Sequence, residues 1–146
     1  MCPVNDRAHT EVVPDLIRAL YEGSDALDAS CLHDDLFFSD PLVRVAGQAK
    51  VVRMFGRLTG FFAATQVVTI ALKEASETQS TWALEVHYKR RAEGRPKIFE
   101  STLVVTGPAQ AIETITEHWH APWNMVGGRR GLIPRPLRAA LGWVFS

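Results

Sequence analysis

The sequence has few cysteines and no long apolar run. Its two cysteines, Cys2 and Cys31, have a spacing that fits neither a disulfide framework nor a metal site, so we expect ordinary thiols in a reducing compartment. No stretch approaches the roughly eighteen apolar residues of a membrane-spanning helix. Asp6 and Glu11 stand where a signal peptide would be apolar. We therefore expect a cytoplasmic protein with no stable membrane insertion.

The sequence also lacks an excess of charge of either sign. Lys plus Arg and Asp plus Glu number 16 each. A chain without net charge has no overall field to attract a nucleic acid backbone, so we expect no nucleic acid partner. The 146 residues, of which 47% are hydrophobic, predict a single globular domain over 1–146. Arginines without local counterions cluster near the end, where we predict a short basic helix over 127–146.

Three segments in the first half of the chain carry apolar residues at helical spacing. They predict helices over 10–21, 25–35 and 48–62, and Asp25 is placed to cap the second of them. Between the second and third, the Phe-rich stretch over 36–40 predicts a short strand that Pro41 stops.

After Thr65 the apolar period changes from helical spacing to two. Four strands are predicted, over 65–75, 81–91, 97–106 and 111–120, and turn-forming clusters separate them. Such short turns pair each strand antiparallel with its predecessor. Helices followed by a meander are typical of an α+β fold in which the helices cover one sheet face.

Two stretches resemble a known superfamily: "LIRALYEGSDALDASCLHDDLFFSDPLVRVAG" near the start and "ITEHWHAPWN" near the end. They are similar to the nuclear transport factor 2-like fold, also called SnoaL-like, which includes ketosteroid isomerases and polyketide cyclases, and in particular to bacterial members. The resemblance implies a cone-shaped, curved antiparallel sheet wrapped around about three N-terminal helices, with an internal hydrophobic pocket. It also implies a homodimer and no cofactor.

The Asp40-Pro41 pair is the strongest catalytic candidate. Proline restricts the residue before it to extended backbone, so the Asp40 carboxylate is aimed by geometry. In ketosteroid isomerases the corresponding aspartate is the base that moves a proton next to a carbonyl. The alternative is that Asp40 only closes the Asp-Pro turn. Those enzymes stabilise the oxyanion with a tyrosine and a protonated aspartate, positions that align here with Leu16 and Ser101, so steroid isomerisation itself is not expected.

Further site residues follow from strand alternation and from the resemblance. His118 could relay a proton with Asp40, and it shares a predicted face with His120; the alternative is that both are ordinary residues of a sheet face. No metal site is predicted, because the His118 and His120 pair lacks a third ligand of recognisable spacing. Glu100 is expected to point outward. The predicted ligand-lining residues are Leu16, Phe38, Phe55, Trp82, Tyr88, Ser101, Trp119 and His120.

Two functions remain open at this point. The first is a pocket protein that binds a small, apolar, carbonyl-bearing ligand and carries out proton transfer, isomerisation or cyclisation with Asp40 as base. The second is a non-catalytic ligand-binding domain, or a dimerisation domain whose open sheet face pairs with a second copy.

Overall fold

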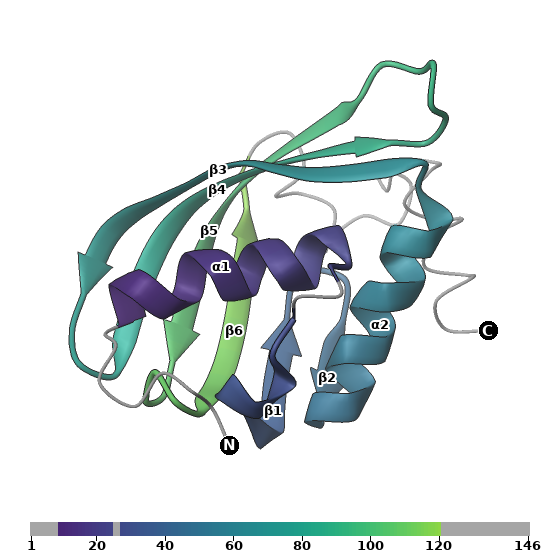
Figure 1. Ribbon diagram of the computed structural model, residues 1–146. Helices are drawn as coiled ribbons and strands as arrows, with labels where there is room; N and C mark the ends of the chain where they lie inside the picture. Colours follow the sequence, from purple (N-terminus) through teal and green to yellow (C-terminus); the bar gives the residue numbers. More distant parts are fainter. Residues whose placement is uncertain (1–8, 25–26, 121–146) are drawn as a thin grey trace.

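The computed structural model of the chain describes residues 9–24 and 27–120. The predicted basic helix over 127–146 and the predicted cap Asp25 lie outside the described residues. Within them the structure contains two α-helices, one short 3-10 helix and six strands, and the strands form one curved sheet (Figure 1).

The sheet has the strand order β2-β1-β6-β5-β4-β3. Its strands are β1 (Leu32–Ser39), β2 (Arg44–Ala46), β3 (Ala64–Ala75), β4 (Gln79–Lys89), β5 (Lys97–Thr106) and β6 (Ile112–Trp119). The predicted antiparallel meander is confirmed for β3 to β6. The expectation of a wholly antiparallel sheet is wrong, because β1 pairs parallel with β6. The cone shape implied by the resemblance stays a prediction.

Two of the three predicted helices are confirmed, as α1 (His9–Glu22) and α2 (Gln48–Phe61). The second predicted helix is replaced by a single turn of 3-10 helix, Ala29–Cys31, and β1 begins at Leu32. The side chain of Asp28 accepts a hydrogen bond from the backbone N–H of Ser30 and so caps that turn. The apolar side chains that follow belong to a strand, because Leu36 and Phe38 are buried while Phe37 between them is exposed.

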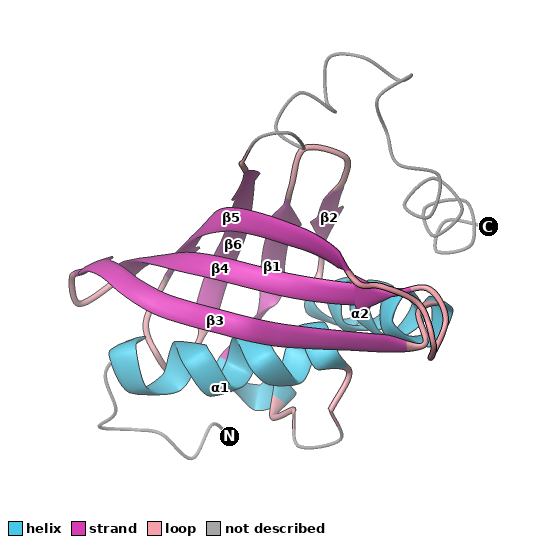
Figure 2. Cartoon of the chain, turned by 90° about the horizontal axis from the view of Figure 1, so that it is seen from above, coloured by secondary structure: helices cyan, strands magenta, loops and turns pink. Residues whose placement is uncertain are grey.

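Both α-helices lie against the same face of the sheet (Figure 2). We call this face the inner face; it carries buried residues such as Val86, Leu103 and Ile115. The core between the helices and the inner face includes Ile17 of α1 and Val51 of α2. Complete burial of one such aliphatic side chain contributes about 1.5–3 kcal/mol, so this contact fixes the helices on the sheet.

Helix α1 is also attached to the edge strand β3. The Arg18 guanidinium donates to the carbonyl oxygen of Val67 at 2.6 Å, and the Glu22 carboxylate accepts from the N–H of the same residue at 2.8 Å. Two side chains one turn apart thus occupy backbone groups that an edge strand would leave unpaired. This attachment sets the position of the C-terminal end of α1 over the sheet.

The expectation that both cysteines are ordinary thiols is wrong for Cys31, which is disulfide-bonded. The only other cysteine of the sequence, Cys2, lies outside the described residues. Disulfides are rare in reducing compartments, so the cytoplasmic location stays a prediction that this bond does not support. Among the described helices, none has both the length and the apolar character needed to cross a membrane.

Candidate active site

The parallel pairing of β1 with β6 brings two acids together. Phe38 pairs with Ile115 and Ser39 pairs with Thr116. Asp40 follows Ser39 just past the end of β1, and Glu117 follows Thr116 in β6. Alternation turns both side chains toward the inner face, as it does for the buried Phe38 and Ile115. The two carboxyl groups therefore lie side by side where the short strand β1 ends.

Asp40 is partly buried, and one of its oxygens closes a turn. Oδ1 accepts hydrogen bonds from the backbone N–H groups of Leu42 and Val43, both at 2.8 Å. Both bonds use the same oxygen, so Oδ2 takes no part in the turn. Burial raises the pKa of Asp40 to about 6 against the lowering effect of these two bonds. The turn-closing role and a role in proton transfer are therefore compatible.

Glu117 is buried and is held by three donors. The Tyr21 hydroxyl and the Ser101 hydroxyl donate to Oε2 at 3.2 and 3.0 Å, and the Trp119 indole N–H donates to Oε1 at 2.8 Å. The pKa of Glu117 is raised to about 7, first by burial and then by the neighbouring charge of Asp40, against the lowering effect of the three hydrogen bonds. A group with this pKa exchanges its proton readily near neutral pH.

An aromatic wall, formed by Phe62, Tyr88, Phe99 and Trp119, lies beside Asp40 and Glu117, which we call the acid pair. The ring of Tyr88 lies 5.0 Å from the ring of Phe62 and 5.5 Å from that of Phe99, and the Phe99 and Trp119 rings are 5.5 Å apart. Burial raises the pKa values of Tyr21 and Tyr88 well above the ordinary phenol value, and the charges of Glu117 and Asp40 add to this. No cation contributes to the pKa shifts of Asp40, Glu117 and the two tyrosines in the part of the chain that is described.

The two histidines do not face this site. His118 is exposed on the outer face of the sheet, opposite to the helices, because it alternates with the buried residues Glu117 and Trp119. His120 is partly buried on the outer face, where its Nε2 is hydrogen-bonded to the hydroxyl of Thr102 at 2.8 Å. The predictions that His118 acts with Asp40 and that His120 lines the pocket are corrected accordingly.

The remaining predicted residues divide into two groups. Tyr88, Ser101 and Trp119 lie with Asp40 and Glu117, as described above. Leu16, Phe38, Phe55 and Trp82 are buried in the main core. The Trp82 indole donates to the hydroxyl of Ser80, which is also bonded to His9, so its polar group belongs to a different buried cluster. Glu100 is exposed on the outer face, as predicted.

Sequence reasoning missed Glu117 and Tyr21. Tyr21 follows Ile17 by four residues, so it shares the buried face of α1, and that spacing could have singled it out. Glu117 alternates with Ile115 and Trp119, but only the strand pairing fixes which of the two alternating sets faces inward.

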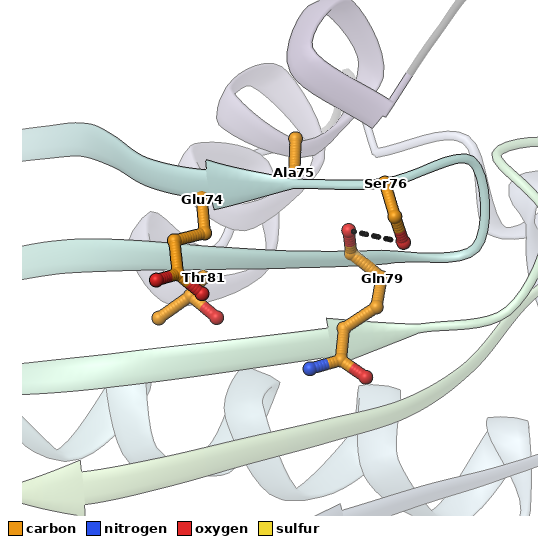
Figure 3. Close-up of a pocket in the computed structure, with 5 residues that line it drawn as sticks. All are labelled: Glu74, Ala75, Ser76, Gln79 and Thr81. Atoms are coloured by element: carbon orange, nitrogen blue, oxygen red, sulfur yellow. Dashed lines mark hydrogen bonds between the residues drawn. The ribbon is translucent and has the colours of Figure 1, made fainter.

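A surface hollow of about 290 Å³ lies at the opposite end of β4 from Tyr88 (Figure 3). It is lined by Glu74, Ala75, Ser76, Gln79 and Thr81. It shares no residue with the acid pair. Within residues 9–24 and 27–120, no group of three or more His, Cys, Asp and Glu side chains is arranged to hold a metal ion.

No known family model and no curated protein matches the chain. Among solved structures it is similar to a nuclear transport factor 2-like protein from Anabaena variabilis, with a TM-score of 0.64, 15% identity, and coverage of 83% of this chain and 95% of that one. A proposed polyketide cyclase from Pseudomonas putida also gives a TM-score of 0.64, with 14% identity and coverage of 79% and 93%. A proposed SnoaL-like polyketide cyclase from Shewanella putrefaciens gives 0.64, with 8% identity and coverage of 81% and 84%. With two helices on one face of a curved six-stranded mixed sheet and these structural neighbours, the chain has the nuclear transport factor 2-like fold.

Proposed function

We propose that the acid pair and its aromatic wall form a binding site for a small, apolar ligand that carries a carbonyl group. We further propose that Asp40 is the base that removes a proton from the carbon next to that carbonyl. The observation that carries the proposal is the pair itself: partly buried Asp40 beside buried Glu117, with pKa values of about 6 and about 7. Two carboxyl groups can act as acid and base when, at neutral pH, one is ionised and the other still holds its proton.

The proton transfer can be written with the groups that are present. The Asp40 carboxylate takes the proton from the α-carbon, the electron pair of that C–H bond forms a double bond to the carbonyl carbon, and the π pair of the C=O bond moves to the carbonyl oxygen. When Glu117 is protonated, its O–H can donate to the Tyr21 oxygen, which leaves the Tyr21 hydroxyl hydrogen for the oxygen of the ligand. Return of the proton to the same carbon or to another one completes an exchange or an isomerisation. Removal of one such donor typically costs about 100-fold to 1000-fold in rate.

The charge of the site supports a neutral ligand. Among residues 9–24 and 27–120, no cation contributes to the pKa shifts of the two acids, so an anionic ligand would meet two acids that no described cation offsets. The aromatic rings of Tyr88, Phe99 and Trp119 would provide apolar contact for the ligand skeleton. The similar structures described as polyketide cyclases are consistent with chemistry next to a carbonyl.

Deuterium exchange tests the proposal without knowledge of the natural ligand. The protein is incubated in D₂O with 1-tetralone, a bicyclic ketone, and deuterium uptake at the carbon next to the carbonyl is followed by NMR. We expect wild-type protein to accelerate uptake and Asp40→Asn to lose about 100-fold or more of that acceleration. Asp34→Asn, a matched change at an exposed position of β1, the strand that precedes Asp40, should leave uptake unchanged. Equal uptake with D40N and wild-type protein, both folded, would remove Asp40 from the role of base.

A homodimer through the outer face is a second proposal. Ile98 on β5 is 48% exposed there, although large aliphatic side chains are usually buried. Light scattering after gel filtration gives the mass in solution. We expect a dimer mass for wild-type protein and a shift toward the monomer for Ile98→Glu. A monomer mass for the wild type would contradict this second proposal and leave the first intact.

A further inference from the structure

Thr65 has a buried hydroxyl without a hydrogen-bond partner. In the described residues, its Oγ1 is the only buried side-chain nitrogen or oxygen without one. Buried polar groups in proteins are nearly always hydrogen-bonded, to protein or to something bound. The Thr65 hydroxyl therefore points to a partner that the described protein groups do not supply.

Thr65 lies directly opposite Tyr88 in the antiparallel pair of β3 and β4. Directly paired residues share a face of the sheet, with Cβ atoms about 5 Å apart. Tyr88 belongs to the aromatic wall of the candidate site, and both Glu117 and Asp40 act on its pKa. The unpaired hydroxyl thus lies next to Tyr88 at the side of the site, three strands away from Glu117 in the strand order.

The surroundings of Thr65 and Tyr88 do not favour a simple bound water as the partner of the Thr65 hydroxyl. A buried water usually needs two to four polar partners. The neighbour of Thr65 on the side of the site is Tyr88, whose ring packs between Phe62 and Phe99. An aromatic wall offers an apolar ligand good contact, and the hydroxyl then offers that ligand one polar contact.

We propose that Thr65 is a specificity residue that binds an oxygen at the far end of the ligand. The expected ligand is then a rigid, apolar ketone that carries a second oxygen far from the reacting carbonyl. This second oxygen belongs to a hydroxyl or to another carbonyl group. A threonine hydroxyl both donates and accepts, so either kind of oxygen can pair with it. This inference rests on the proposed function, because it assigns the far end of the same ligand.

A pair of probes that differ by one oxygen tests the inference. They are 1-tetralone and 6-hydroxy-1-tetralone, which carries its hydroxyl on the ring side away from the carbonyl. Dissociation constants are measured by calorimetry for wild-type protein, for Thr65→Val and for Thr69→Val. Valine has the shape of threonine without the hydroxyl, and Thr69 is an exposed residue of the same strand that serves as the matched control.

We expect wild-type protein and T69V to bind the hydroxylated ketone about five-fold more tightly, as one hydrogen bond allows. T65V should bind both ketones equally, with the affinity for 1-tetralone unchanged. The same preference in T65V and in wild-type protein would overturn the inference while leaving the proposed function standing. Failure of wild-type protein to bind either ketone would overturn the proposed function, and the inference with it.

A ligand-free measurement gives the inference a second test. If the hydroxyl has no partner in the free protein, its replacement by a methyl group should raise the thermal midpoint of T65V by about 2–4 °C. T69V should change the midpoint by less than about 1 °C. A lower midpoint for T65V would show that the hydroxyl is already paired in the free protein, and that would overturn the inference.

Discussion

Asp40 lies beside Glu117 because Ser39 pairs with Thr116 in the parallel ladder between β1 and β6. In the part of the chain that the structure describes, no cation is among the groups that shift the pKa of either acid. Two neighbouring carboxyl groups, one buried and one partly buried, cannot both ionise cheaply. The pair therefore holds a proton near neutral pH, and its protons come off in two coupled steps.

Stability should fall as the pH rises through the range in which the pair ionises. The pKa values of Asp40 and Glu117 rise from 3.8 to about 6 and from 4.5 to about 7. Between these values the folded state holds protons that the unfolded chain has released, so the free energy of unfolding decreases with pH. The stabilisation is complete below about pH 4 and is lost above about pH 7. The free energy of unfolding, measured by chemical denaturation, should be a few kcal/mol larger at pH 5 than at pH 8.

Glu117→Gln provides the comparison for that experiment, because it keeps the shape of the side chain and removes its titration. We expect the variant to show a clearly smaller decrease of stability between pH 5 and pH 8 than wild-type protein. Asp34→Asn, at an exposed site, should retain the wild-type decrease. If E117Q and wild-type protein decrease equally, Glu117 does not titrate in this range and its pKa is not raised.

Trp119→Phe should cost more stability at high pH than at low pH. The indole N–H donates to Glu117 Oε1, and this hydrogen bond lowers the pKa of Glu117, so it favours the ionised form. We expect a loss of about 1–3 kcal/mol at pH 8 and a smaller loss at pH 5. The control is Trp82→Phe, because that indole donates to the neutral hydroxyl of Ser80. A pH-independent loss in W119F would argue against a charged partner.

Tyr21→Phe separates packing from chemistry. The ring of Tyr21 packs on Phe55 with centroids 4.7 Å apart, and that contact remains in the variant. Glu117 keeps its bonds to Ser101 and Trp119, so we expect a stability loss of only about 1 kcal/mol. Deuterium uptake into 1-tetralone should fall about 100-fold to 1000-fold, because the donor to the developing oxyanion is lost. Unchanged uptake in a folded Y21F protein would assign the oxyanion contact to another group.

Replacement of two glycines by alanine should change the stability of the protein in opposite directions. Gly107 has a φ of +106°, and a Cβ there would lie 2.7 Å from the backbone nitrogen of Glu113, so Gly107→Ala should destabilise the protein by more than about 1 kcal/mol. Gly56 is in α2 with open space around it, so Gly56→Ala should stabilise by about 0.5–1 kcal/mol. Thermal unfolding measures both. Destabilisation by G56A would mean that the exposed face of α2 is covered in solution.

The parts of the fold that depend on local patterns were predictable from the sequence. Helices α1 and α2 follow from apolar spacing of three and four, and the meander from β3 to β6 follows from alternation and short turns. The parallel pairing of β1 with β6 joins segments far apart in the chain, and no local pattern encodes it. For the same reason the stretch after Asp28 looked helical, although Leu32 already belongs to the sheet.

The site was predictable only in part, and the reason is the inward set of residues on β6. Strict alternation from Ile112 puts His118 and His120 on the same face as Ile112, and Ile112 is buried. Ile115 is buried too, three residues later, and the pairing of β1 with β6 shifts register in this region. The alternation therefore changes phase, which exposes His118 and turns Glu117 inward. Asp40 was found because the constraint from Pro41 is local.

The most direct test is a ¹³C NMR titration of the side-chain carboxyl groups of Asp40 and Glu117 in wild-type protein and in D40N. We expect two coupled titrations near pH 6 and pH 7 in the wild type. In D40N we expect Glu117 to titrate at a lower pH, because the neighbouring charge of Asp40 is gone. Titration of both wild-type carboxyl groups below about pH 5, as in exposed acids, would contradict this expectation.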